Sequence, residues 1–478
     1  MDPQTIVLVV IHAVIAPVTA GHALLFKRDS RAAFGWVSAC LLFPLFGPIA
    51  YALFGINRVQ TRAREMHAQR PLRRLVGFER EGPFALDRAP RSYPGLSDAF
   101  VPVARLSDAV TNHPLCEGNS VSVLENGERA YPKMLEAIDA AMSSVFLMTY
   151  IFDTDTSGQR FVDALTRAAS RGVDVRVIVD GFGERYSHPR VGKLLRRAGV
   201  RVVRFLPLRL FPPSLNLNLR NHRKLLIADG SVAFAGGMNI GDRHMVTMES
   251  NRKRAQDLHF EFRGTICGQL HDVFRDTWWF VTGESIASPE VVPQSGSETC
   301  RVILDGPDDN LDKLEIVLIG AIAAARKSVT IMTPYFLPSR EFISVLKTAS
   351  LKGVNVRVIL PEKSNLPYVQ WATQNVLGEL IQGGVRVFRQ PPPFSHAKLV
   401  VVDEYYAVVG SANIDARSLR LNFEIGIEVI GTEFAASLGT YVDRCLENAS
   451  QYTLDEIDGR ALPVRLRDAF CWLFQPYL

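Results

Sequence analysis

The sequence predicts an α/β protein made of two homologous halves that follow an N-terminal membrane anchor. Three observations indicate this: two long uncharged stretches at the N-terminus, segments that recur in constant order, and helical segments that alternate with Val- and Ile-rich strands. The chain has 478 residues, of which 47% are hydrophobic and 22% charged, so it is long enough for two or three domains and is not disordered. Its net charge of +5 gives only a weak preference for anionic partners.

Residues 1–58 are predicted to form a two-helix transmembrane anchor. Residues 3–26 and 32–57 carry no charged side chain, and a bilayer core needs about 20 apolar residues per helix. A cleaved signal peptide ending at "VTA" is the alternative, but "MDPQT" lacks the basic residues of such a peptide and the second span would remain. His12 and His22 are assigned structural or interfacial roles.

Basic residues around the two spans indicate the orientation of the chain. The loop between the spans carries three (Lys27, Arg28 and Arg31), and six follow the second span (Arg58, Arg62, Arg64, Arg70, Arg73 and Arg74). The positive-inside rule therefore places the larger cluster and the rest of the chain in the cytoplasm. Residues 59–115 are predicted to be a juxtamembrane connector, whose arginines are either attracted to anionic headgroups or simply solvated.

The remaining sequence repeats itself. "SSVFLMTYIF" (143–152) resembles "KSVTIMTPYF" (327–336), "RGVDVRVIVD" (171–180) resembles "KGVNVRVILP" (352–361), and "NHRKLLIADGSVAFAGGMNI" (221–240) resembles "SHAKLVVVDEYYAVVGSANI" (395–414). A break near 285–298 separates the two halves, which we place at 116–290 and 291–478. Constant order in both sets predicts two domains of the same fold.

Each half is predicted to run helix, strand, helix, strand, loop and then a strand pair. "YPKMLEAIDAAM" and "FVDALTRAASRG" have helical spacing, and a strand follows each. Such alternation favours a mainly parallel sheet covered by helices on both faces. The strand pairs are joined by turns at Asp229-Gly230 and Asp403-Glu404.

Both strand pairs carry the pattern His-x-Lys-x4-Asp-x6-Gly-[Gly/Ser]-x-Asn. The first half supplies His222, Lys224, Asp229, Gly236, Gly237 and Asn239, and the second supplies His396, Lys398, Asp403, Gly410, Ser411 and Asn413. A His and a Lys two residues apart on a strand point to the same face. Lysine charge, asparagine amides and close backbone approach suit a phosphate, and two histidines can divide nucleophilic attack and protonation of the leaving oxygen.

A metal site is the rival interpretation of these histidines. Protonated lysine is a poor ligand, and no His, Asp, Glu or Cys set has ligand spacing. The six cysteines are scattered without a CxxC pair, which indicates reduced thiols. The sequence therefore predicts neither a metal nor another cofactor.

The duplicated motif is similar to that of the phospholipase D superfamily. The N-terminal hairpin, "GGMNIGD", "DTWWFVTGE", "SHAKLVVVD…VGSANIDARSLRLNFEIGIEV" and "CWLFQPYL" together resemble bacterial cardiolipin synthases over nearly the whole chain. The resemblance implies two phospholipase D-type α/β/α sandwich halves related by a pseudo-two-fold axis, one active site at their seam, and a location in the bacterial inner membrane. It also implies phosphatidyl transfer between two phosphatidylglycerol molecules through a phosphatidyl–histidine intermediate, giving cardiolipin and glycerol.

By the same resemblance, His222 is the nucleophile and His396 the general acid and then base, although the symmetric motifs leave this order open. Glu424 and Asp257 are expected to orient the imidazoles, unless they are ordinary strand-edge charges. Asp229 and Asp403 are expected to buttress the site from their turns. The residues expected to bind or support the phosphate are Asn239, Asn413, Ser411, Gly237, Asp257 and Glu424. Because the first half has Gly237 where the second has Ser411, the two halves present different groups to the phosphate.

Three further features keep two interpretations each. Phe211-Pro212-Pro213 and Pro391 to Pro393 either line a membrane-facing mouth or only fix the angle at which a strand begins. Trp278 and Trp279 lie either at the membrane interface or in the core. The C-terminal "LRDAFCWLFQPYL" docks either on lipid or on the catalytic body.

Other functions share parts of this pattern. A hydrolase that releases phosphatidic acid would use the same covalent step, with water as the acceptor. A nucleic-acid phosphodiesterase is disfavoured by the small net charge and the membrane hairpin, and a catalytically dead scaffold by the intact His and Lys pairs. The expected partners are phosphatidylglycerol and an anionic phospholipid membrane, with no nucleic acid. Oligomeric state, acyl-chain preference and other donor lipids are left open.

Overall fold

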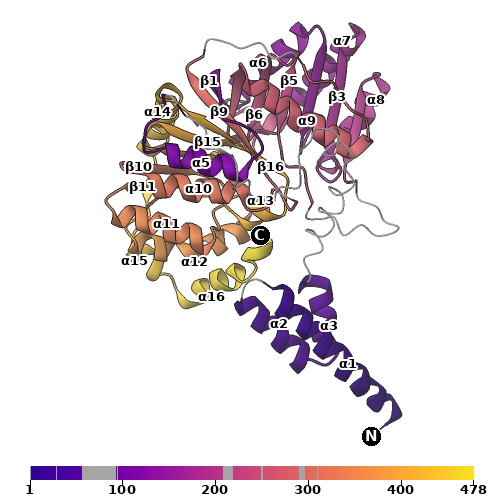
Figure 1. Ribbon diagram of the computed structural model, residues 1–478, viewed down its shortest axis with the longest axis vertical. Helices are drawn as coiled ribbons and strands as arrows, with labels where there is room; N and C mark the ends of the chain where they lie inside the picture. The colour runs from indigo at the N-terminus through magenta and orange to yellow at the C-terminus, as the bar shows by residue number, and fades with distance from the viewer. Residues whose placement is uncertain are drawn as a thin grey trace. The chain divides into compact units, whose positions relative to one another are not determined.

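The computed structural model describes residues 2–27, 30–55, 93, 95–207, 219–248, 251–289, 296–308 and 310–478 (Figure 1). The chain divides into two compact units, Met1–Gln69 and Arg70–Leu478. Most of the predicted connector at 59–115, and Phe211-Pro212-Pro213, lie outside the described residues.

The first unit consists of helices α1 (Pro3–Phe26), α2 (Ser30–Leu42) and α3 (Phe46–Ala50) and the π-helical turn η1 (Tyr51–Gly55). Within the described residues, Leu8–Phe26 is long and apolar enough to cross a membrane, whereas the apolar part of α2 is shorter. The second span predicted over 32–57 is therefore not one continuous helix. Pro44 has no N–H to continue α2, and Leu45 turns the chain with a φ of 59°.

Both histidines of the first unit make local contacts. His22 Nδ1 lies 2.7 Å from the Tyr51 hydroxyl, and the Leu45 amide donates to His12 Nδ1 at 3.3 Å. These contacts join α1 to the segment that follows α2. The structural roles expected from the sequence fit this arrangement.

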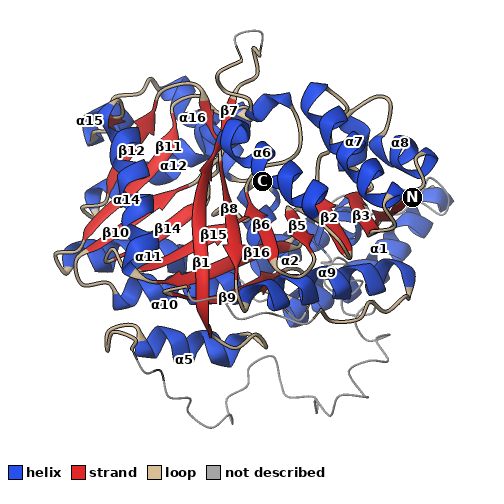
Figure 2. Ribbon diagram, turned by 90° about the horizontal axis from the view of Figure 1, so that it is seen from above, coloured by secondary structure: helices blue, strands red, loops and turns tan. Residues whose placement is uncertain are grey.

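The second unit contains two α/β halves that share one sheet. The strands of the first half are β1 (Cys116–Glu125), β2 (Ser144–Thr149), β3 (Asp174–Asp180), β4 (Arg201–Phe205), β5 (Leu225–Ala228), β6 (Val232–Gly236) and β8 (Leu258–Arg263). Its helices are α6 (Asn126–Ala140), α7 (Thr156–Ser170), α8 (Val191–Arg197) and α9 (Ile266–Thr282). Figure 2 shows α7 and α9 on opposite sides of these strands.

The second half repeats this arrangement. Its strands are β9 (Glu298–Asp305), β10 (Ser328–Met332), β11 (Asn355–Pro361), β12 (Arg386–Gln390), β14 (Leu399–Val402), β15 (Tyr406–Gly410), β16 (Glu424–Ile430) and β17 (Ser450–Gln451). Its helices are α10 (Lys313–Ala324), α11 (Arg340–Leu351), α12 (Pro367–Gln382), α13 (Ala416–Arg420), α14 (Thr432–Glu447), α15 (Leu454–Asp458) and α16 (Leu462–Trp472). Helix α5 (Val101–Val110) precedes both halves, and the short strands β7 (Ala255–Gln256) and β13 (Phe394–Ser395) form a separate pair.

Equivalent strands of the two halves follow in the same order from the middle of the sheet toward each edge. Fifteen strands run β17-β12-β11-β10-β14-β15-β16-β9-β1-β8-β6-β5-β2-β3-β4, and the halves join where β1 pairs with β9. Among the described strands of this sheet, only β2-β3-β4 and β10-β11-β12 run parallel. The mainly parallel sheet expected from the sequence is therefore wrong. The turns at Asp229-Gly230 and Asp403-Glu404 reverse the chain, and the strand that follows each pair returns antiparallel.

Each half has its own core of Val, Ile, Leu and Phe side chains from strands and covering helices. Trp278 is buried on α9, where its ring stacks on Phe274 at 6.0 Å. The core interpretation therefore holds for Trp278. The C-terminal segment docks on the catalytic body, because Trp472 packs beside Leu337 and Val369.

Candidate active site

The two histidine-bearing segments meet at the seam between the halves. The His222 amide donates to the Phe423 carbonyl at 3.0 Å, and the His396 amide donates to the Gln256 carbonyl at 2.6 Å. Each histidine segment is thus hydrogen-bonded to the residue just before a carboxylate of the other half: Phe423 precedes Glu424, and Gln256 precedes Asp257. This backbone pairing fixes which carboxylate each imidazole meets.

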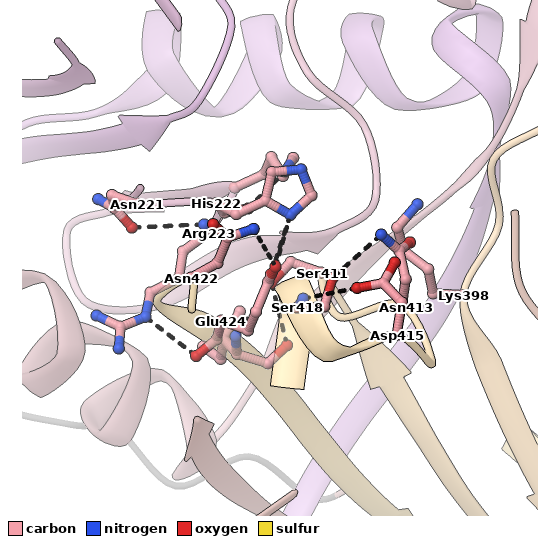
Figure 3. A network of polar contacts seen from close by, with 12 residues as sticks. Asn221, His222, Arg223, Lys398, Ser411, Asn413, Asp415, Ser418, Asn422 and Glu424 are labelled. Atoms are coloured by element: carbon pink, nitrogen blue, oxygen red, sulfur yellow. Dashed lines mark hydrogen bonds and ion pairs between the residues drawn. The ribbon is translucent and has the colours of Figure 1, made fainter. Parts of the chain in front are cut away.

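The carboxylate pairing is crossed between the halves. His222 contacts Glu424 (Figure 3), with 2.8 Å between Nδ1 and Oε1, and His396 Nδ1 lies 2.7 Å from Asp257 Oδ2. Both carboxylates are fully buried. Because a carboxylate at Nδ1 holds the proton there, it leaves Nε2 of each imidazole for chemistry.

Lys224 and Lys398 lie beside these pairs. Each Nζ donates to the carbonyl of the histidine two residues earlier, at 2.5 Å in both halves. Burial lowers the pKa of Lys224 to about 7 and that of Lys398 to about 8, although Glu424 and Asp257 respectively oppose the shift. The two ammonium groups also interact: Lys398 lowers the pKa of Lys224. A bound anion would relieve this repulsion.

Burial and the lysines lower the pKa of both imidazoles and so favour their neutral form. Burial lowers the pKa of His222, against the opposing effect of Glu424. Burial, Lys398 and Lys224 together lower the pKa of His396 well below its ordinary value. A neutral imidazole with a free Nε2 is a nucleophile, and the histidine that acts as acid must take up a proton together with the anionic substrate.

Asp229 and Asp403 lie at the opposite ends of β5 and β14 from the histidines, where they accept hydrogen bonds from backbone amides. Asp229 accepts hydrogen bonds from the amides of residues 142, 143 and 144, each at 2.8 Å. Asp403 accepts from the amides of residues 326, 327 and 328 at 2.7 to 2.9 Å. Each carboxylate thereby ties the turn after the motif strand to the start of the neighbouring strand.

Replacement of Asp403 by alanine is expected to destabilise the protein more than it harms the chemistry. Three amides lose a charged acceptor, and because they can be rehydrated we expect a loss of about 2 kcal/mol in unfolding free energy. Denaturant unfolding measures this, and the folded fraction should keep its turnover. Glu404→Ala is the matched control, since Glu404 is an exposed residue of the same turn with a similar φ of 55°. Equal destabilisation by both variants would contradict the role of the Asp403 carboxylate.

The two halves differ at one position of the motif, and the carboxylate beside that position differs as well. Gly237 lies beside Asp257, and Ser411 lies beside Glu424. A Cβ atom on Gly237 would lie 2.4 Å from Asp257 Oδ1, and this carboxylate accepts from the Leu258 amide at 2.8 Å. In the second half the Ser411 hydroxyl donates to Glu424 Oε2 at 2.5 Å and accepts from the Ile425 amide at 3.0 Å. Ser411 therefore supports Glu424 from the buried side, and the longer glutamate leaves room for it.

This relation predicts a paired substitution. Gly237→Ser alone should displace Asp257 from His396 and lower kcat by about 100-fold, since catalytic geometry tolerates little misplacement. Gly237→Ser combined with Asp257→Glu reproduces the second-half arrangement and should recover part of the loss. Steady-state assays of the single and double variants measure the effect. An unimpaired single variant, or a double variant worse than the single, would contradict this reading of the contact.

Asn239 and Asn413 hold the loops that flank the site. Asn239 Oδ1 accepts from the Ile151 amide at 3.0 Å, and Asn413 Nδ2 donates to the Ser418 hydroxyl at 3.1 Å. Their role as phosphate donors remains a prediction. Among the described residues, no group of three or more His, Cys, Asp or Glu side chains is arranged to hold a metal ion.

Several residues around the site were not identified from the sequence. The Tyr150 ring lies 5.2 Å from the His222 ring and 5.6 Å from Lys224 Nζ, and the Tyr335 ring lies 6.4 Å from the His396 ring. Both tyrosines follow a strand in the repeated segments "MTYIF" and "MTPYF", but they do not align, since Tyr150 matches Pro334 and Tyr335 matches Ile151, so the repeat alone did not identify them. Asp180 accepts from the Asn221 amide at 3.0 Å and so positions the segment that leads to His222.

Comparisons with known proteins show which family the sequence resembles. The sequence model described as "Cardiolipin synthase, PLD-like domain" matches residues 134–278 and 318–446, and the one described as "Phospholipase_D-nuclease N-terminal" matches residues 7–55. The chain is 32% identical to the major cardiolipin synthase ClsA of Bacillus subtilis, over 95% of each protein. It is 29% identical to a cardiolipin synthase of Geobacillus thermodenitrificans, over 95% of this chain and 90% of that protein.

A solved structure extends the likeness to the fold. Phosphatidylserine synthase of Haemophilus influenzae superposes with a TM-score of 0.61 at 15% identity. The superposition covers 79% of this chain and 100% of that one.

Proposed function

The chain belongs to the cardiolipin synthase family of phospholipase D-like phosphatidyltransferases, and on this premise we propose that it joins two phosphatidylglycerol molecules into cardiolipin and glycerol. The observation that carries this proposal is the crossed site: two histidines, each paired through Nδ1 with a carboxylate of the other half, beside two buried lysines. Such a site can hold one phosphodiester and act on it from both sides.

In the first step, His222 Nε2 attacks the phosphorus of one phosphatidylglycerol. The phosphorus–oxygen bond to the terminal glycerol breaks, and His396 Nε2 gives that oxygen its proton, so that glycerol leaves. Lys224 and Lys398 stabilise the negative charge on the non-bridging oxygens, and the amides of Asn239 and Asn413 are proposed to donate to them.

In the second step, His396, now neutral, accepts the proton of a glycerol hydroxyl from a second phosphatidylglycerol. The hydroxyl oxygen attacks phosphorus, the phosphorus–nitrogen bond to His222 breaks, and cardiolipin is released. Burial, Lys398 and Lys224 lower the pKa of His396. This order of roles therefore requires the bound phosphodiester to offset the lysine charge and let His396 carry its proton.

Lipid analysis of the purified protein tests the function. Incubation with phosphatidylglycerol in mixed vesicles should give cardiolipin and free glycerol in equal amounts. Phosphatidic acid as the main product would instead identify a hydrolase. No turnover of phosphatidylglycerol, with activity on another phospholipid, would reject the proposed donor.

The lysines predict the alkaline limb of the pH profile. An ammonium group is charged below its pKa and neutral above it, so kcat/KM should fall as the pH rises through the range of about 7 to about 8. The assay is kcat/KM from pH 5.5 to 9.5. Lys224 has the lower pKa, about 7, and so sets where the fall begins. Lys224→Arg keeps its charge throughout this range, so its limb should move up toward about 8, the pKa of Lys398, even if turnover is lower. An unchanged limb in Lys224→Arg would assign the titration to another group.

We further propose that the N-terminal unit holds the protein in the membrane as a multi-pass anchor, with the catalytic unit in the cytoplasm. The apolar helix at Leu8–Phe26 and the matched N-terminal family segment support the anchor. The six arginines after residue 57 support the orientation. Protease digestion of right-side-out and inverted membrane vesicles tests it, and cleavage of the catalytic unit in right-side-out vesicles would reverse the assignment.

A further inference from the structure

The C-terminal helix α16 is fixed to the catalytic body along one face. Asp468 is buried and accepts from Arg467 Nη2 at 2.7 Å, and the Arg467 guanidinium lies 4.3 Å from the Trp371 ring on α12. Arg460 also pairs with Asp468. Cys471 and Trp472 pack in the small cluster formed around Leu337, Val369 and Ala372. The orientation of α16 on the body is therefore determined by specific contacts.

The opposite face of α16 is apolar and exposed. Its side chains recur at the spacing of one helix face, and between 48% and 67% of each is accessible; they are Leu462, Leu466, Phe470, Leu473 and Phe474, here called the α16 stripe. A helix on a soluble protein normally turns such a stripe toward the core. Five large apolar side chains in one stripe instead indicate a surface that binds something apolar.

The α16 stripe is connected to the loops that carry Tyr335 and Asn413 beside the active site, here called the active-site mouth. Gln475, just after the helix, donates to the carbonyls of Leu337 and Pro338 at 3.2 and 2.8 Å. Leu337 follows Tyr335, whose ring lies beside His396. The C-terminal Leu478 carbonyl accepts from the Arg417 amide at 3.1 Å on α13, the helix that follows Asn413. Two contacts thus join the end of α16 to loops that flank the site.

Exposed tyrosines lie around the same mouth. Tyr186 in the first half and Tyr368 in the second are 59% and 45% exposed. Both are close enough to Tyr335 to contribute to the raised pKa of its hydroxyl, which burial chiefly causes. Tyrosine is favoured at the boundary between lipid headgroups and acyl chains, because it is apolar along its ring and polar at its tip.

We propose that the α16 stripe inserts into the surface of an anionic phospholipid bilayer and places the active-site mouth at headgroup level. Arg465 is exposed on the same helix, and Arg467 keeps 42% of its side chain exposed although it pairs with Asp468, so basic side chains flank the apolar stripe. This combination is typical of helices that lie in the membrane interface, and it matches anionic headgroups better than the apolar face of another protein. A lipid substrate presents its phosphodiester at that depth. The placement of the active site at this depth rests on the function proposed above, in which the substrate is a phospholipid.

Quenching by brominated lipid tests the insertion without any use of activity. The full-length chain is placed in nanodiscs containing phosphatidylglycerol, with or without bromine on the acyl chains. Phe470→Trp should gain emission that brominated lipid quenches. Leu351→Trp, at a 77% exposed leucine on α11, is the matched control, and brominated lipid should not quench its added emission. Equal quenching at both positions, or none at residue 470, overturns the proposal.

Activity on two forms of the lipid separates docking from a structural role. Leu466→Glu with Phe470→Glu should lower turnover of bilayer phosphatidylglycerol at least about tenfold, because two apolar anchors are lost. The same variant should retain turnover of a short-chain, monomeric phosphatidylglycerol, and Leu351→Glu should retain both. Equal loss on both substrates, or a change in oligomeric state that shows a second copy on the stripe, overturns the proposal. If phosphatidylglycerol is not the substrate, both assays fail while the quenching persists.

Discussion

Replacement of either His222 or His396 by alanine is expected to abolish cardiolipin formation, with kcat lowered by roughly 10⁴-fold or more. Each imidazole offers an Nε2 that the other cannot replace, since one must bond to phosphorus while the other moves a proton. Both variants should fold, because each histidine contributes an imidazole at a partly open seam rather than a core side chain. Turnover assays with thermal melting measure both properties.

The two histidine variants also separate the roles. If His222 is the nucleophile, His222→Ala forms no covalent adduct, whereas His396→Ala slowly accumulates a phosphatidyl adduct on His222 that mass spectrometry can locate. An adduct on His396 in the His222→Ala protein would reverse the order. His271→Gln is a control for the loss of a histidine outside the site, because His271 is buried on α9 and packs against Phe146 of β2. It should keep its activity.

The duplicated motif made the contents of the site predictable from the sequence. A His and a Lys on one face of a strand, found at equal spacing in two halves, require a shared partner between the halves. The turn positions of Asp229 and Asp403 indicated a supporting role, and each carboxylate accepts hydrogen bonds from backbone amides at the start of the neighbouring strand. Both inferences depend on short segments, in which local spacing fixes direction.

Relations between distant strands were not predictable in the same way. The sheet was expected to be mainly parallel because helices and strands alternate, but β5 and β14 return antiparallel beside β2 and β10. That direction depends on the connections before the motifs, 206–224 and 391–398, whose path local spacing does not define. The crossed pairs depend likewise on the seam, where the segment before His222 contacts Phe423 and the segment before His396 contacts Gln256.

The crossed pairs make the second large prediction. Glu424→Gln and Asp257→Asn keep the volume of each side chain but remove the charge that holds the proton on Nδ1, and each should lower kcat by about 10²- to 10⁴-fold. Because Glu424 belongs to the second half but serves His222, Glu424→Gln should lose the step lost in His222→Ala, namely adduct formation. Asp257→Asn should instead form the adduct and fail to resolve it, as His396→Ala does. Rapid-quench measurement of adduct and product distinguishes these outcomes.

A matched carboxylate separates this effect from a general loss of charge. Glu261 lies on β8 four residues beyond Asp257 and pairs with Arg263 at 2.7 Å, away from both imidazoles. Glu261→Gln should therefore change neither step. If Glu424→Gln accumulated adduct and Asp257→Asn formed none, each carboxylate would serve the histidine of its own half, and the crossed geometry would not be the catalytic one. The expected pattern instead makes each half incomplete alone, since its histidine has the correct tautomer only when the other half supplies the carboxylate.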